Sequence, residues 1–457
     1  MQLLAIDWAV VGVKAGQLIL ALSILVILHE FGHYITARWF GCRVEKFYLF
    51  FDPWFSLFKK KVGDTEYGVG WLPLGGYVKI SGMIDESMDT EAMKQEPQPW
   101  EFRSKPAWQR LIIMLGGIIM NVIVAIVIYG MVLFVWGESK VPMTSLKYGI
   151  TFQDSMYHRI GFEKGDRIIS VDDKPVLYLD DATLKVFTGK SAVVDRNGTQ
   201  IRLQFPESMI GDLIESKKKG GLRLEARVPA IVGSFDGVDK SPAKDAGLLE
   251  GDVIQFVDSQ AVFFYDEIRP ILLGSDKKEV SIIYKRNGEV RSTIYKLTDE
   301  GKLNLPLIYD YDQLDVMKIL RVETKKYSFF EAIPAGFSLT VDKLNAYIDQ
   351  FKLILSPKTG AYKGLGGFKA IANAFPGVWD WQSFWSMTAF LSIVLAFMNL
   401  LPIPALDGGH VVFTLYEMIT RRKPNEKFLE YAQMAGMILL LLLMVYANGN
   451  DWFGWGK

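Results

Sequence analysis

The chain places ionisable side chains inside a segment that is otherwise apolar enough to cross a membrane. Residues 15–28 read AGQLILALSILVIL, and after His29-Glu30-Phe31-Gly32-His33 the apolar character continues to Phe40. The two halves together make about 26 residues, and about 20 suffice for a helix that spans a bilayer. Ionisable groups within such a helix are costly and usually functional. The segment therefore predicts a membrane protein with a chemical site in its first helix.

The spacing of these residues indicates a metal site. Positions i and i+4 share one face of a helix, so the imidazoles of His29 and His33 can bind one ion. Glu30 lies beside them and can act as general base. This is the HExxH arrangement of zinc hydrolases, in which zinc lowers the pKa of bound water to about 7. The alternative is a pair of histidines that hydrogen-bond between helices. We expect one Zn²⁺ per chain.

A third ligand is expected near residue 407, in the sequence NLLPIPALDGGH (399–410). Asp407 ends a long apolar run, where a carboxylate needs a partner. Two histidines and one carboxylate form a common catalytic zinc set. His410 is the alternative ligand. The metzincin class is excluded, because it requires glycine and histidine where Thr36 and Trp39 stand.

Three further runs carry no charged residue, namely 111–137, 381–406 and 431–447, so four membrane helices are predicted. Lysine and arginine cluster after the first helix, before the second, and between the third and fourth. By the positive-inside rule that side is cytoplasmic. Both termini and residues 138–380 then face outward, and the histidines lie toward the cytoplasmic side. Residues 1–14 lack a basic leader region, so the first helix is expected to be retained.

The predicted cytoplasmic segment contains WLPLGGYVKISG (71–82), whose alternation favours a strand behind a Gly-Gly turn. It is either an ordinary surface hairpin or an exposed strand edge that binds an unwound substrate by β-addition. The aromatic-rich run LFFDPWFSLF (49–58) predicts contact with the membrane interface.

The predicted outer segment contains an internal repeat. GFEKGDRII (161–169) recurs as GLLEGDVIQ (247–255), and each copy leads into a strand and a turn. The repeats resemble PDZ domains, which bind extended peptides or C-termini, although two PDZ-shaped domains without ligands are also compatible. Farther on, apolar residues at spacings of four and three predict an amphipathic helix, either on the outer membrane surface or packed under the repeats; they are Phe337, Val341, Leu344, Ile348, Phe351 and Leu355.

The composition argues against some classes of function. The chain has 51 basic and 51 acidic residues, so nothing suggests nucleic-acid binding. The single cysteine, Cys42, can form no intrachain disulfide. A membrane-tethered scaffold and a metal transporter remain as alternatives to a hydrolase. Glu30 next to His29 favours hydrolysis over both.

HEFGH in one membrane helix together with NLLPIPALDGG in a later one resembles the site-2 protease family of intramembrane zinc metalloproteases. The LGGYVK segment and the two outward repeats resemble its bacterial envelope-stress branch, that of the regulator of sigma-E protease (RseP). The resemblance implies that Glu30 activates water and that zinc is bound by His29, His33 and Asp407. It also implies substrate binding by Asn399, Gly75, Gly76, Tyr77 and Val78. Relatives often carry Gly-Pro before the asparagine of the second helix, whereas Gly117-Ile118 precede Asn121 here.

The expected fold class is a multi-pass α-helical membrane protein with four transmembrane helices, a cytoplasmic membrane-associated β-hairpin or sheet, and two tandem PDZ-like β-rich domains outside. The expected segments are a first transmembrane helix at 1–40, the β region at 41–107, a second helix at 108–137, PDZ-like domains at 138–225 and 226–310, an amphipathic membrane-surface region at 311–380, a third helix with the LDGG motif at 381–410, and a fourth at 429–448.

The expected function is that of a zinc metalloendopeptidase of the bacterial inner membrane. Its substrates would be transmembrane segments of single-pass proteins within the lipid bilayer. The resemblance implies an anti-sigma factor whose outer domain has already been trimmed, and remnant signal peptides. Peptide C-termini are the expected ligands of the PDZ-like domains.

Overall fold

The computed structural model describes residues 7–83, 96–216, 223–235, 242–272, 278–297, 305–308 and 310–455. It divides into two compact units. The first comprises Met1–Gly137, Lys326–Lys352 and Leu365–Lys457, and the second comprises Glu138–Lys325 and Leu353–Gly364.

Four helices of the first unit are long and apolar enough to cross a membrane, as predicted for the described part of the chain. They are α1 (Trp8–Trp39), α2 (Ala107–Trp136), α11 (Trp381–Leu400) and α13 (Glu426–Phe453). Three begin directly after a capping side chain that accepts hydrogen bonds from the first free N–H groups, as helix starts require. The caps are Asp7, Asp380 and Asn425.

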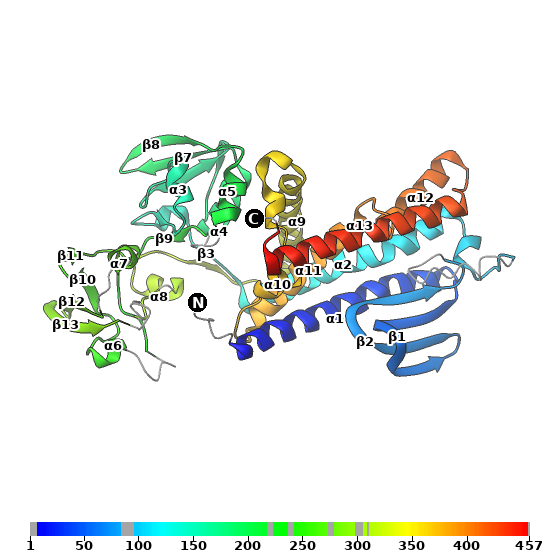
Figure 1. Ribbon diagram of the computed structural model, residues 1–457, viewed down its shortest axis with the longest axis horizontal. Coiled ribbons are helices and arrows are strands. Elements are labelled where there is room, and N and C mark those ends of the chain that lie inside the picture. Colours follow the sequence, from blue (N-terminus) through cyan, green and yellow to red (C-terminus); the bar gives the residue numbers. More distant parts are fainter. Residues whose placement is uncertain are drawn as a thin grey trace. The chain divides into compact units, whose positions relative to one another are not determined.

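Helices α1, α2 and α11 pack along one another in the first unit (Figure 1). Their shared core includes Ala21, Leu25, Ala125 and Phe384, all fully buried. Helices α1 and α2 approach each other closely at Gly32 and Gly116, where an added Cβ on Gly32 would lie 2.3 Å from the Gly116 carbonyl oxygen. Glycines allow such close backbone contact between membrane helices.

The third predicted helix is interrupted. Within the expected third-helix segment, 381–410, the prolines Pro402 and Pro404 predict a break, and the structure has one: α11 ends at Leu400 and a new helix, α12 (Asp407–Thr420), begins at Asp407. Pro402 and Pro404 lie in the connection between these two helices. Proline lacks the N–H that a continuing helix needs, so the helix is interrupted there. This unit also contains two short helices, η2 (Phe102–Ser104) and α10 (Phe368–Asn373).

The predicted β region, 41–107, contains two long strands, β1 (Val44–Val62) and β2 (Thr65–Ile80). Both strands bend, so that each contributes twice to one antiparallel sheet. Residues 44–49 of β1 pair with 76–80 on one side and with 66–69 on the other. No described strand pairs with the outer edge of residues 76–80. The aromatic run 49–58 lies within β1, and Trp54 at its centre is 90% exposed.

Helix α9 (Phe329–Leu355) ends where the sequence predicts, before Ser356-Pro357. The face that it buries differs from the predicted apolar stripe. Ala332, Gly336 and Thr340 are buried, whereas Phe337 is 57% exposed. The face formed by these three small residues packs against α2, since a Cβ on Gly336 would lie 2.6 Å from the backbone nitrogen of Gly130.

The second unit contains two four-stranded antiparallel sheets with the same strand order, β6-β5-β7-β8 and β11-β10-β12-β13. The strands of the first are β5 (Arg167–Val171), β6 (Lys174–Pro175), β7 (Ser191–Arg196) and β8 (Thr199–Gln204). Those of the second are β10 (Val253–Val257), β11 (Gln260–Ala261), β12 (Glu279–Arg286) and β13 (Glu289–Lys296). The two copies of the sequence repeat thus fold alike.

The repeated Gly-Asp turn has the same anchor in both copies. Arg196 binds the buried carboxylate of Asp166 and the carbonyl of Gly161. Arg286 binds Asp252 and the carbonyl of Gly247 in the same way. A buried carboxylate requires such a partner, so each arginine fixes the turn to the end of the third strand.

The remaining elements of the second unit are short. The helices are α3 (Met156–Arg159), α4 (Leu179–Thr188), α5 (Met209–Ser216), α6 (Pro242–Asp245), α7 (Tyr265–Leu272), α8 (Tyr311–Val316), η3 (Met143–Ser145), η4 (Pro357–Thr359) and η5 (Ala361–Gly364). The strands are β3 (Glu138–Lys140), β4 (Ile150–Thr151), β9 (Glu225–Ala226) and β14 (Glu323–Lys325).

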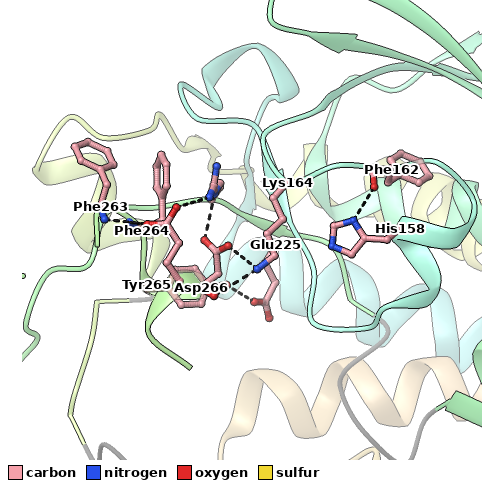
Figure 2. A network of polar contacts seen from close by, with 10 residues as sticks. His158, Phe162, Lys164, Glu225, Phe263, Phe264, Tyr265 and Asp266 are labelled. Atoms are coloured by element: carbon pink, nitrogen blue, oxygen red, sulfur yellow. Dashed lines mark hydrogen bonds and ion pairs between the residues drawn. The ribbon is translucent and has the colours of Figure 1, made fainter. Parts of the chain in front are cut away.

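The domain boundary expected at residue 310 differs from the observed packing. Leu314 and Leu320 are buried in the core of the first β-rich domain, and β14 pairs with β3 at its start. The second domain therefore lies within the sequence of the first. The two domains meet at Asp266 (Figure 2), which binds Lys164 Nζ at 2.7 Å and Arg227 Nε at 3.2 Å.

Candidate metal centre

Two imidazoles converge on one face of α1. His29 and His33 are one helical turn apart, and their Nε2 atoms lie 3.3 Å from each other. His33 is buried, and its Nδ1 lies 2.8 Å from the carbonyl oxygen of Ile113 on α2. A carbonyl oxygen only accepts, so Nδ1 of His33 carries the proton and Nε2 keeps its lone pair for a metal.

The carboxylate of Asp407 joins the two imidazoles. Its Oδ2 lies 3.3 Å from Nε2 of His29 and 3.3 Å from Nε2 of His33. Asp407 is the first residue of α12, and the chain reaches this position through a tight turn. A Cβ on Gly408 would lie 2.2 Å from the carbonyl oxygen of Leu401, so only glycine allows this approach.

The three atoms have the spacing of zinc ligands. Zinc binds nitrogen and oxygen at about 2.0–2.1 Å, so two ligands of a tetrahedral site lie about 3.3–3.4 Å apart. All three separations among His29 Nε2, His33 Nε2 and Asp407 Oδ2 are 3.3 Å. Oδ2 is buried and has no hydrogen-bond partner, which a bound cation would supply. The group fits a metal ion, and His410 is not a member of it.

Helix α2 closes the other side of the imidazole pair. A Cβ on Gly117 would lie 2.4 Å from Nε2 of His33 and 2.5 Å from Cε1 of His29. The stretch Gly117-Ile118 therefore lines the metal group and is part of a continuous helix. The sequence analysis had given it no role at the site.

A side chain from α2 also reaches the site. The amide of Asn121 lies 3.1 Å from Nδ1 of His29, and Asn121 is fully buried. Sequence reasoning assigned it no function. The sequence feature that could have indicated a role for Asn121 is its polar amide in the middle of an uncharged run of membrane-spanning length.

Glu30 meets the edge strand of the sheet. The Glu30 carboxylate faces the backbone N–H of Val78 in β2. A Cβ on Gly76 would lie 2.7 Å from Val26 Cγ1 and 3.6 Å from Glu30 Cγ. Gly75 and Gly76 lie within the strand rather than at a turn, and the missing side chain lets β2 pack against α1.

Tyr77 points to the other side of this strand and fixes it to β1. Its hydroxyl donates to Asp52 Oδ1 at 2.9 Å, and its ring stacks on Tyr48. Burial and the neighbouring Asp52 carboxylate raise the pKa of Tyr77, so the hydroxyl remains a donor.

Asn399 also reaches the metal group. It lies in the last turn of α11, with Nδ2 3.3 Å from Nε2 of His29. Of the residues predicted for the site, the structure thus brings the two histidines, Glu30, Asp407, Asn399 and the strand at Gly76–Val78 into one region.

Comparison with known proteins identifies the family. The model of peptidase family M50 matches residues 17–443, nearly the whole chain. The chain belongs to peptidase family M50. This is the site-2 protease family whose motifs the sequence displays, so the M50 assignment confirms a zinc metalloprotease and excludes the scaffold and transporter alternatives.

Relatives of this M50 peptidase match over almost their whole length. A protein of Neisseria meningitidis named "Putative zinc metalloprotease" is 30% identical over 464 residues, which cover 95% of this chain and 97% of the relative. Proteins of the same name from Vibrio cholerae and Thermotoga maritima are 27% and 25% identical, each with 95% of this chain and 97% of the relative covered.

Substituting Gly117 by alanine should weaken zinc binding. The new Cβ would overlap Nε2 of His33, so one imidazole must leave its place or α2 must shift. We expect at least an about tenfold loss of zinc affinity, measured by competition with a chelator in detergent. Gly16→Ala is the matched control, because nothing lies within 4 Å of a Cβ there. Equal affinities for the two variants would contradict the observed packing.

Proposed function

We propose that this M50 metalloprotease is an intramembrane endopeptidase that cleaves transmembrane segments of single-pass membrane proteins. One observation carries the proposal. Glu30, in a helix of membrane-spanning length, lies beside the outer edge strand of β2, because a Cβ on Gly76 would lie 3.6 Å from Glu30 Cγ and the carboxylate faces the backbone of Val78. The candidate general base therefore lies next to a free strand edge. That edge can bind an extended substrate backbone close to the Glu30 carboxylate.

Such an edge answers the main difficulty of cutting a membrane helix. A helix hides its scissile carbonyls in internal hydrogen bonds, and an unsatisfied backbone group in lipid costs several kcal/mol. The substrate must unwind locally, and the enzyme must replace the lost bonds. Residues 76–80 of β2 offer their outer N–H and C=O groups to an added strand. We assign substrate binding to Gly75, Gly76, Tyr77 and Val78 on this basis.

The remaining roles follow from the contacts at the site. We assign His29, His33 and Asp407 to holding zinc, which when bound acidifies the attacking water and polarises the scissile carbonyl. Glu30 takes the proton from the water and delivers it to the leaving amine, as a positioned carboxylate can. When Nε2 of His29 is a ligand it cannot accept from Asn399, so we assign the Asn399 amide to the substrate backbone.

The orientation rests on the distribution of positive charge. Lys and Arg follow α1, precede α2 and separate α12 from α13, which favours a cytoplasmic location of those segments in a bacterial inner membrane. The termini and the second unit then face the periplasm, and the metal centre lies toward the cytoplasmic side. Water reaches the site from there.

We assign a gating role to the two β-rich domains. Their repeat resembles PDZ domains, and the ion pair of Lys164 with Asp266 joins them to each other. Together they exclude substrates with a bulky outer domain, or recognise the C-terminus that trimming exposes. An anti-sigma factor in an envelope stress response, once trimmed, is the substrate class implied by the resemblance, and remnant signal peptides have a similarly short outer part.

Coexpression with single-pass test proteins tests this function. A test protein with a short outer tail should yield a shortened cytoplasmic fragment that ends within its membrane segment. The same protein with a folded outer domain should remain intact. Cleavage of both at equal rates would contradict the gate, and cleavage confined to the soluble part would contradict the intramembrane site.

The edge strand gives a separate prediction. Val78→Pro removes the N–H that faces Glu30, and proline is tolerated at an outward-facing position of an edge strand. We expect kcat/KM for a membrane substrate to fall about 10- to 100-fold, with zinc content unchanged, because one N–H donor is lost to Glu30 and to the substrate backbone, and a hydrogen bond to a charged group is worth about 1.5–3 kcal/mol. Val78→Ala keeps the N–H and serves as control. Equal activity of both variants would show that the Val78 N–H serves neither Glu30 nor the substrate backbone.

A further inference from the structure

We propose that Asn121 is a positioning residue of the metal centre. Its side-chain carbonyl oxygen accepts a hydrogen bond from Nδ1–H of His29 and thereby directs Nε2 of His29 to the ion. This deepens the proposed function and rests on it, because it takes His29 to be a ligand.

The first support is the contact itself. The Asn121 amide lies 3.1 Å from Nδ1 of His29, on the side of the ring opposite to Asp407. A histidine that binds metal through Nε2 must carry its proton on Nδ1, and that proton needs an acceptor. The Asn121 amide is the group that the described structure places there.

The second support is an unpartnered atom. Asn121 is fully buried, yet its Oδ1 makes no hydrogen bond while Nδ2 faces the imidazole. The nitrogen and oxygen of an amide exchange places by a half-turn of the side chain, with no shift of the helix. After that turn the oxygen faces Nδ1–H of His29, which is the arrangement that a metal at Nε2 requires.

The third support is the parallel with His33. Its Nδ1 is bound by the carbonyl oxygen of Ile113 at 2.8 Å. Ile113, Gly117 and Asn121 are spaced four residues apart, so they share one face of α2. On that face, the carbonyl of Ile113 contacts Nδ1 of His33, and the amide of Asn121 contacts Nδ1 of His29. Between them, Gly117 has no side chain and leaves room for both rings.

The position of Asn121 is itself held from a third helix. Ser392 of α11 donates from its hydroxyl to the backbone carbonyl oxygen of Asn121 at 2.7 Å, and both residues are fully buried. This bond fixes α2 relative to α11, which also carries Asn399. The amide of Asn121 is therefore presented to His29 from a rigid backbone, as a positioning residue requires.

The test compares Asn121→Leu with Asn121→Asp. Both have nearly the shape of asparagine, but only aspartate keeps an acceptor. Zinc affinity of the purified full chain in detergent is measured by competition with a chromogenic chelator, and the coordination is followed by the visible spectrum of the Co²⁺-loaded protein. We expect Asn121→Leu to bind zinc about 10- to 100-fold more weakly with an altered Co²⁺ spectrum, and Asn121→Asp to bind as tightly as wild type or tighter.

The control separates this role from general packing. Asn450 is a buried asparagine of α13 whose amide donates to the carbonyl of Leu365, away from the metal group. Asn450→Leu should leave zinc affinity unchanged. Wild-type affinity and spectrum in Asn121→Leu, or equal losses in the leucine and aspartate variants, would overturn the proposal. If His29→Ala also retained wild-type affinity, the zinc assignment of the proposed function would fail instead.

Discussion

Replacing Glu30 by glutamine should abolish proteolysis while zinc stays bound. Glutamine keeps the size of the side chain and its contact region with Val78 but cannot take a proton from water. General acid–base catalysis contributes about 10²- to 10⁴-fold, so cleavage of a membrane substrate should fall by that factor. The measurement pairs the cleavage rate in reconstituted vesicles with zinc content per chain.

The control for this variant is Glu163→Gln, an exposed carboxylate of the second unit. It should cleave at the wild-type rate. A Glu30→Gln enzyme with near-wild-type cleavage would remove the general-base role. One that had lost its zinc would show that Glu30 holds the metal centre together rather than moving protons.

Replacing Asp407 by alanine should remove both zinc and activity. The variant loses one of the three groups assigned to zinc and leaves two imidazoles four residues apart on a single helix. We expect zinc per chain to fall to near zero after dialysis against a weak chelator, and cleavage to become undetectable, because zinc sites depend on the full ligand set.

His410→Ala is the matched comparison, since His410 was the alternative third ligand and lies three residues farther along α12. It should keep its zinc, since His410 is outside the group formed by the described residues. Retention of zinc by Asp407→Ala together with its loss in His410→Ala would reverse the ligand assignment.

The sequence predicted the parts of the site that have a periodic or charge signature. His29 and His33 share a helical face by spacing alone, and Asp407 stands out as a carboxylate at the end of an apolar run. The membrane helices follow in the same way from uncharged runs of sufficient length. These features need no knowledge of how the helices pack.

The parts contributed by packing were not predictable from pattern. Ile113 acts through a backbone carbonyl, which has no sequence signature, and Gly117 and Asn121 matter only because α2 lies against α1. The buried face of α9 likewise follows from close contact with Gly130 rather than from its apolar stripe. Leu314 and Leu320 joined the first β-rich domain because β14 returns to β3, a pairing between strands far apart in sequence.

X-ray absorption at the zinc edge of the purified protein tests the central claim most directly. Two imidazoles and one carboxylate predict nitrogen and oxygen scatterers at about 2.0–2.1 Å, with the multiple-scattering pattern of two histidines. A sulfur scatterer at about 2.3 Å would contradict this account, because it would place Cys42, the single cysteine of the chain, in the metal site. A spectrum with no histidine contribution would contradict it equally.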